Sequence, residues 1–150
     1  MRLTEPSGLE SAEPRSAPNK PRPRACIATL DPRHRGGTLT STRILYDVLT
    51  RNGWDPYLVY NSIDPEMHFP SRLRNTRGVT LSVRPEEFDG MKGFAVPLLL
   101  PQFESLSYML NFFQWRRASS GAGLNVVLGG GVQSGICFAL GGVSFFCWVG

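Results

Sequence analysis

Residues 25–60 read ACIATLDPRHRGGTLTSTRILYDVLTRNGWDPYLVY, and this stretch decides the fold. It begins with the short apolar run ACIATL, which has turn residues on both sides and is typical of a buried strand. A helical pattern runs from Thr38 to Asn52, with apolar side chains at i, i+4 spacing on one side, and stops at an Asn-Gly pair. PYLVY (56–60) is a second strand. Strand, tight loop, helix and strand within about 36 residues have the dimensions of one βαβ unit.

The middle of the chain has weaker patterns. GVTLSV (78–83) is typical of a strand, and RPEEFDGMKG (84–93) of a polar turn or a short helical piece. FAVPLLLP (94–101) is apolar but holds two prolines, which argues against a central strand and favours an edge or loop segment. ESLSYMLNFFQWRR (104–117) is predicted to be a helix, with cationic residues in its last turn where the helix dipole favours them.

The last 33 residues, 118–150, carry no charged side chain. An uncharged run of more than about 18 residues is by length a transmembrane candidate, and this alternative stays open. Glycines divide the run into LNVVL, VQSGICFAL and VSFFCWV, a pattern that favours a buried strand, a short helix and another buried strand. Parallel strands covered on both faces are this hydrophobic in α/β proteins. We therefore predict an open, mostly parallel sheet with helices on both faces, a Rossmann-like α/β fold.

Charge and cysteines limit the class of protein. Residues 1–24 hold five prolines and five basic side chains, and we expect a disordered tail there, followed by one domain over 25–150. From residue 25 onward the count is 11 basic to 9 acidic side chains, so no basic stripe marks a nucleic-acid binder. Cys26, Cys137 and Cys147 lie in apolar runs without CxxC spacing, which favours reduced, core-facing thiols in a cytoplasmic protein.

The first candidate site is the loop DPRHRGG. Ligands of a doubly wound sheet bind outside the carboxyl ends of its strands, and a helix N-terminus there suits a phosphate or carboxylate. Gly36 and Gly37 would let the backbone approach such a ligand, and His34 could contact it or act as a general base. The alternatives are a sharp turn and an exposed loop histidine. The loop matches neither the GxGxxG nor the GxxxxGK[ST] phosphate motif.

The second candidate is GGGVQSG (129–135), which also joins an apolar strand to a helix. Its backbone, together with Gln133 or Ser134, could face a ligand in the same crevice. A close packing contact between helix and strand explains these glycines equally well. The two histidines, His34 and His68, have no metal-ligand partner at helical spacing, so we expect no metal site.

The order of these pieces resembles the N-terminal domain of GT-B glycosyltransferases, and within them the retaining "family four / group one" enzymes. The resemblance rests on the Gly-Gly loop after the first strand, on TRILYDVLTRNGWDPYLVY (42–60), and on NVVLGGGVQSG with GGVSFFCWV near the end. It covers residues 25–150. It implies one half of a GT-B fold that binds the acceptor, whereas a C-terminal domain, which residues 1–150 do not include, binds the nucleotide-sugar.

The resemblance also implies roles for individual residues. Gly36 and Gly37, with His34 beside them, would line the cleft near the donor diphosphate, where backbone N–H groups stabilise the leaving group. The acceptor side would be formed by Gly130, Gly131, Gln133 and Ser134. No cofactor is implied besides the nucleotide-sugar co-substrate, and the acceptor is a glycan or a small molecule.

Three further expectations follow from the sequence. Without the C-terminal domain the chain should not transfer a sugar, so it is a hexosyltransferase-type enzyme only when that domain is supplied. A stand-alone α/β module that binds a phosphorylated ligand without chemistry is the alternative function. The helix LNFFQWRR (110–117) could also lie on a membrane surface through its aromatic side chains and cationic end.

Overall fold

The sheet has six strands and is parallel except at one edge. The computed structural model describes residues 21–33, 36–62, 64, 83–98, 106–107, 110–128 and 132–148. The order across the sheet is β3-β4-β2-β1-β5-β6, and only the β3–β4 pair is antiparallel. The strands are β1 (Arg24–Ala28), β2 (Asp55–Asn61), β3 (Arg84–Phe88), β4 (Met91–Val96), β5 (Leu124–Leu128) and β6 (Phe146–Trp148). This order confirms the predicted Rossmann-like α/β class.

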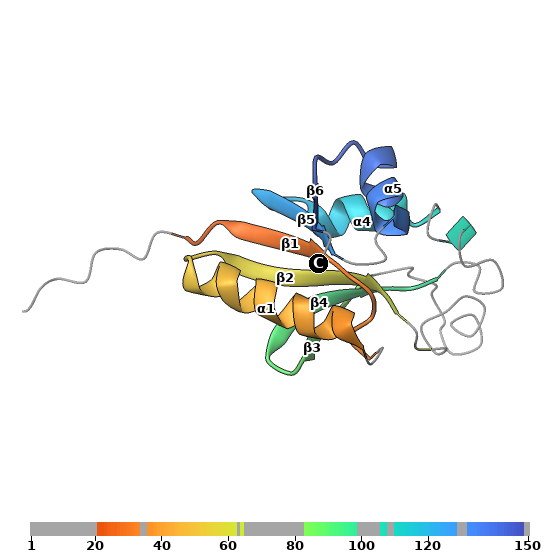
Figure 1. The fold of residues 1–150 in the computed structure, drawn as a ribbon. Coiled ribbons are helices and arrows are strands. Elements are labelled where there is room, and N and C mark those ends of the chain that lie inside the picture. The colour runs from red at the N-terminus through yellow and green to blue at the C-terminus, as the bar shows by residue number, and fades with distance from the viewer. Residues whose placement is uncertain are drawn as a thin grey trace, which may run out of the picture.

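Helices cover both faces of the sheet, as predicted. Helix α1 (Gly37–Arg51) packs on one face, and α4 (Phe112–Ser119) and α5 (Val132–Leu140) pack together on the other (Figure 1). The crossovers from β1 to β2 and from β5 to β6 run in opposite directions along the sheet. Right-handed connections in opposite directions place their helices on opposite faces, which explains the two layers.

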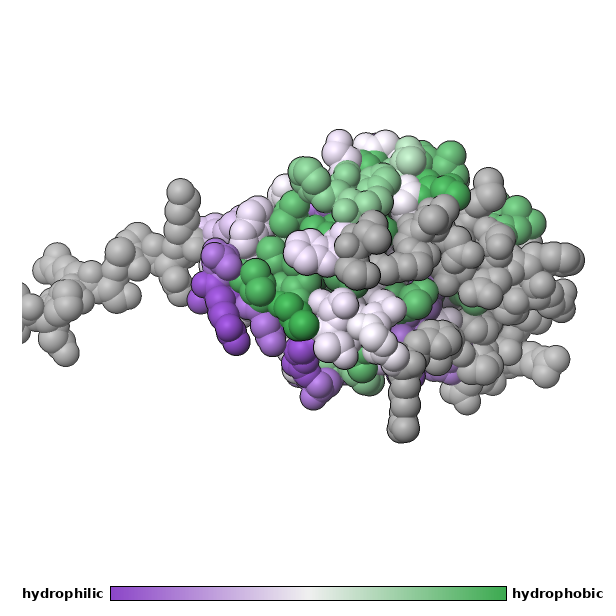
Figure 2. Space-filling model, in the orientation of Figure 1, coloured by the Kyte–Doolittle hydropathy of each residue, from purple (hydrophilic) through white to green (hydrophobic). Residues whose placement is uncertain are grey.

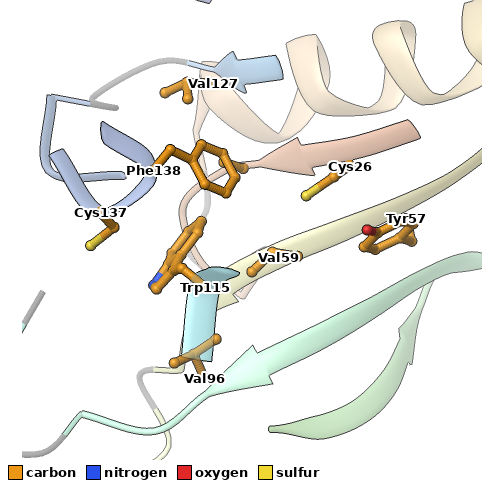
Figure 3. Close-up of a cluster of buried hydrophobic side chains, with 9 residues drawn as sticks. Cys26, Tyr57, Val59, Val96, Trp115, Val127, Cys137 and Phe138 are labelled. Carbon is orange, nitrogen blue, oxygen red and sulfur yellow. The ribbon is translucent and has the colours of Figure 1, made fainter. Parts of the chain in front are cut away.

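Alternation along the strands divides the core into two clusters. In β1, Ala25 and Ile27 face α1, whereas Cys26 and Ala28 face α4 and α5, and all four are fully buried. The cluster on the α4 side is centred on Trp115, whose ring meets that of Phe138 edge to face (Figure 3). Strands that are buried on both faces have continuous apolar sequences, and this pattern allowed them to be predicted from the sequence.

The segment 84–96 is a β-hairpin, so the predicted polar turn and edge or loop segment are wrong for it. β3 and β4 are joined by Asp89 and Gly90, whose φ angles of 50° and 75° are those of a tight two-residue hairpin turn. β4 lies inside the sheet between β3 and β2. The prolines do not prevent this, because Pro85 is in the edge strand and Pro97 follows the last residue of β4.

Two other expectations need correction. Cys26 and Cys137 are buried, and burial raises the pKa of each thiol to about 12, but Cys147 is exposed in the edge strand β6. Helix α4 begins at Phe112 rather than at residue 104, although 106, 107 and 110 are also helical. The predicted strand over 78–83 lies outside the described residues except for Val83, and so do the first twenty residues of the predicted tail.

The uncharged C-terminal run forms β5, α5 and β6, so the predicted order of strand, helix and strand is confirmed. The prediction that the last strand is buried is wrong, because β6 is an edge strand whose three residues are all exposed. In the described part of the chain, no helix has the length and apolar character needed to cross a bilayer. Much of the apolar character of this run is nevertheless on the surface. Phe146, Trp148 and Leu140 are 70%, 54% and 53% exposed. Figure 2 shows hydrophobic side chains over β6 and α5, whereas hydrophilic side chains gather around the C-terminal end of α1.

Candidate functional site

The fold places the Gly-Gly loop at a topological switch point. From β1 the chain continues to β2 on one side, and its later strands β5 and β6 lie on the other side. The connections therefore diverge between β1 and β5, and such a divergence leaves a crevice at the carboxyl ends of the two strands. The loop after β1 leads to α1 at this crevice, and the glycine-rich segment 129–131 directly follows β5 in the chain.

Among the described residues, no side chain caps the N-terminus of α1. Gly36 is the N-cap residue, makes no side-chain capping hydrogen bond, and the first turn holds no acidic residue. A Cβ added at Gly36 or Gly37 would meet no atom within 4 Å, so neither glycine is needed for close packing among the described residues. The partial positive charge of the helix N-terminus is thus not offset by a side chain of the first turn.

The loop that leads to these glycines is held by an ion pair. Asp31 is buried and accepts hydrogen bonds from the Arg33 guanidinium at 2.8 Å and 2.6 Å and from the Arg33 backbone N–H at 2.9 Å. The 2.6 Å contact between Arg33 Nη2 and Asp31 Oδ2 is a salt bridge. In this pair the Asp31 side chain is fully buried and the Arg33 side chain is 33% exposed. The hydrogen bond to Asp31 raises the pKa of Arg33 above its ordinary value. The contact between Asp31 and Arg33 therefore explains the presence of both residues through the structure of the loop.

The same guanidinium ties the loop to the neighbouring strands. It donates to Ser62 Oγ at 2.9 Å and lies 3.6 Å from a carboxylate oxygen of Glu86. Glu86 in turn accepts a hydrogen bond from the Tyr60 hydroxyl at 2.7 Å. Burial, and then the hydrogen bond to Glu86, raise the pKa of Tyr60. One polar network thus joins the loop after β1 to the end of β2 and the middle of β3.

A second buried network lies at the end of β2. Asn61 Oδ1 accepts hydrogen bonds from Trp115 Nε1 and from Asn111 Nδ2, each at 3.2 Å. Asn111 Nδ2 also donates to the Pro97 carbonyl at 2.9 Å. These bonds fix the orientation of both amides, because a flip of either would set donor against donor or acceptor against acceptor. Asn61 Nδ2 and Asn111 Oδ1 make no hydrogen bond within the described structure.

The predicted site residues are described only in part. Gly36 and Gly37 are at the crevice, but His34, Gly130 and Gly131 lie outside the described residues, and so does the side chain of Gln133. Ser134 is in the first turn of α5, and its side chain is buried. A Cβ at the next residue, Gly135, would lie 3.4 Å from the Phe145 ring, which is an ordinary van der Waals contact.

Sequence reasoning missed the two polar networks. The spacing of Asp31 and Arg33 was the one local signal, since side chains two residues apart in a turn can pair. Asn61 and Trp115 are 54 residues apart, and nothing in the sequence relates them. No group of three His, Cys, Asp or Glu side chains suited to a metal ion occurs in the part of the chain that the structure covers. The described edge therefore offers the backbone N–H groups at the start of α1 for binding.

Comparison with known proteins adds little to this geometry. No protein-family model matches the sequence. No curated protein matches it either. Among solved structures, the chain is similar to the crystal structure of Acinetobacter baumannii MurG, with 15% identity and a TM-score of 0.46. The match covers 85% of this chain and 34% of that chain, so the chain spans about a third of its length. No function is drawn from a likeness of this degree.

Proposed function

We propose that the chain is the acceptor-binding half of a glycosyltransferase that transfers a sugar from a nucleotide-sugar to a glycan or small-molecule acceptor. The observation that carries the proposal is the N-terminus of α1, uncapped by the described side chains, at the switch point between β1 and β5. The resemblance of residues 25–150 to the N-terminal half of GT-B enzymes agrees with this position. Transfer then requires a C-terminal domain that holds most of the donor.

The described residues support a positioning role in this reaction. The first-turn N–H groups of α1 would stabilise negative charge that develops on the leaving diphosphate. The Asp31–Arg33 pair would hold the loop in place while this charge develops. A module that binds a phosphorylated ligand without chemistry would use the same edge. An assay of sugar transfer with a donor-binding C-terminal domain supplied separates the two functions, because only the glycosyltransferase half should then consume a nucleotide-sugar.

Replacing Gly37 with leucine is expected to abolish diphosphate binding and leave the fold intact. A Cβ at this position would meet no described atom within 4 Å, so the free energy of unfolding should change by less than about 0.5 kcal/mol. The same side chain would fill the space in front of the first-turn N–H groups. The measurement is a ¹H–¹⁵N NMR titration of the chain with UDP and GDP, following the amides of Gly36, Gly37 and Thr38.

The matched control is Thr50→Leu, which adds an apolar side chain at the exposed C-terminal end of the same helix. It should bind the diphosphates as the unchanged chain does. Uridine and guanosine, which lack the diphosphate, should not shift the three amides. The proposal fails if the diphosphates shift amides at the other edge of the sheet, or if Gly37→Leu binds them normally.

We also propose, as a second function, that α4 rests on an anionic membrane surface. Phe113 of α4 is 67% exposed, and Leu106 and Leu110, in the helical residues that precede α4, are 44% and 42% exposed. Arg116 and Arg117 are the charged residues of segment 106–148. An exposed apolar row with a cationic end fits the interface of a bilayer that contains acidic lipids.

Replacing Phe113 with glutamate is expected to prevent binding to phosphatidylglycerol vesicles in a flotation assay. The change removes an aromatic side chain and adds a charge that acidic lipids repel. Ile44→Glu is the control, because Ile44 is 59% exposed on α1, on the opposite face of the sheet. If both variants float with the vesicles like the unchanged chain, or if both are lost, α4 is not the contact surface.

A further inference from the structure

A cleft lies on the α4 side of the sheet, at the edge opposite the switch point. It consists of two hollows of about 290 Å³ and 410 Å³ that share Arg24 and Phe94 in their walls. Arg24 is the first residue of β1, and Asp55, at the start of β2, lines the larger hollow. The cleft is therefore at the amino ends of the central strands, so it is separate from the carboxyl-edge site proposed above.

The position of α4 explains why this part of the face is hollow. The helix ends at Ser119, and the Tyr57 hydroxyl donates a hydrogen bond to the Ala118 carbonyl at 2.8 Å, which fixes the helix end against β2. Arg117, in the last turn, thereby lines the smaller hollow together with Phe94 of β4. The floor between them is aromatic, since the rings of Tyr57 and Phe94 meet edge to face at 5.5 Å.

Arg24 is held in place without using its hydrogen-bonding edge. Its guanidinium carbon lies 4.5 Å from the centre of the Tyr57 ring. A guanidinium that stacks on a ring uses its flat face, and its N–H groups, which lie in the plane, stay available for a bidentate partner. Within the described structure, neither Arg24 nor Arg117 makes a salt bridge or a side-chain hydrogen bond.

The walls of the smaller hollow carry two positive charges and no negative one. Its polar side chains are those of Arg24, Arg117, Gln114 and Ser120. Gln114 Oε1 is buried and has no hydrogen-bond partner among the described atoms, so it can accept a hydrogen bond from a hydroxyl. Two guanidiniums beside an apolar floor match a phosphate or carboxylate attached to a flat or apolar body. The larger hollow has Asp55 and Glu87 in its wall, which disfavours a second negative charge there.

We propose that this cleft binds a monophosphate or carboxylate ligand, with the anion between Arg24 and Arg117 and the apolar body on Phe94. Two sources share this chemistry: a free phosphorylated metabolite and the headgroup of an acidic phospholipid. Such a site is at the edge of the domain away from the proposed transfer reaction. It does not depend on the chain being half of a glycosyltransferase.

The probe is phenyl phosphate, with phenol and inorganic phosphate as partial ligands, titrated into the ¹⁵N-labelled chain at low salt. Saturable binding with a Kd below about 1 mM is expected, with shifts at the Nε–H groups of Arg24 and Arg117. Arg24→Gln and Arg117→Gln should each weaken binding by about tenfold or more, because each removes charge-assisted hydrogen bonds. Arg24→Lys should give an intermediate loss, since it keeps the charge and the stack but not the fork.

Arg116→Gln is the matched control, because it removes the same charge one residue away without lining the cleft. It should bind phenyl phosphate within about twofold of the unchanged chain, since an exposed charge outside the cleft contributes little. A second arm uses phosphatidylglycerol vesicles. If Arg24→Gln weakens vesicle binding and phenyl phosphate does not bind, the anion is a lipid headgroup; saturable phenyl phosphate binding supports a free ligand. The proposal is overturned if neither probe responds to Arg24→Gln and Arg117→Gln, or if Arg116→Gln weakens phenyl phosphate binding as much as they do.

Discussion

Replacing Trp115 with alanine is expected to lower the free energy of unfolding by about 3–5 kcal/mol. The side chain is completely buried between α4 and the sheet, and its ring packs edge to face on Phe138 at 5.5 Å. Since domains of this size are stable by about 5–15 kcal/mol, the variant should lose a large part of its stability. The measurement is urea unfolding followed by circular dichroism.

A second variant separates packing from hydrogen bonding. Trp115→Phe keeps most of the aromatic contact but removes the hydrogen bond to Asn61 Oδ1. It should lower the free energy of unfolding by about 1–2 kcal/mol. The control is Phe113→Ala, on the same helix but 67% exposed, which should change stability by less than about 0.5 kcal/mol. Equal losses for Trp115→Ala and Phe113→Ala would show that α4 is not packed on the sheet as described.

The elements that the sequence predicted are those with a strong local period. β1, α1 and β2 follow from one apolar run, one helical pattern and a second apolar run, and the right-handed βαβ rule then fixes their arrangement. The uncharged run 118–148 was divided correctly because glycines stand at its joints. Each of these signals lies within a dozen or so neighbouring residues.

The hairpin at 84–96 was missed because two local rules conflicted. Acidic residues and prolines disfavour strands, and they outweighed the Asp89–Gly90 pair, which is a strong hairpin signal. What decided the structure was pairing with β2, whose residue Leu58 is aligned with Gly93 of β4. A Cβ at Gly93 would lie 3.1 Å from the Tyr60 ring, so a glycine there permits the close approach. That contact joins strands far apart in the chain and has no local signature.

The same distinction applies to the candidate site. The position of Gly36 and Gly37 at the ligand edge follows from their place after the first strand of a doubly wound sheet, which the sequence predicted. The networks that fix this edge do not follow, because Arg33 bonds Ser62 across 29 residues and Asn61 bonds Asn111 across 50. Local pattern thus located the loop, whereas the atoms that hold it were visible only in the folded chain.

Replacing Asp31 with asparagine is expected to lower the free energy of unfolding by about 2–3 kcal/mol, which is the second largest effect that we predict. The change keeps the size of the side chain but removes the charge that accepts two hydrogen bonds from the Arg33 guanidinium. Arg33 is 33% exposed, so water solvates part of the charge left behind and keeps the cost below that of a fully buried pair. Chemical unfolding at neutral pH measures the loss.

Asp89→Asn provides the control for the same chemical change at a surface ion pair. Asp89 pairs with Arg43, but its side chain is 71% exposed, and its φ of 50° is one that asparagine adopts readily. The free energy of unfolding of the Asp89→Asn variant should differ from that of the unchanged chain by less than about 0.5 kcal/mol. The Asp31→Asn variant should also show faster amide exchange at Gly36 and Gly37 and weaker UDP binding at temperatures where it remains folded, because the pair fixes the loop that presents these N–H groups. A stability loss without either effect would separate the Asp31–Arg33 pair from the ligand edge and leave it a purely structural contact.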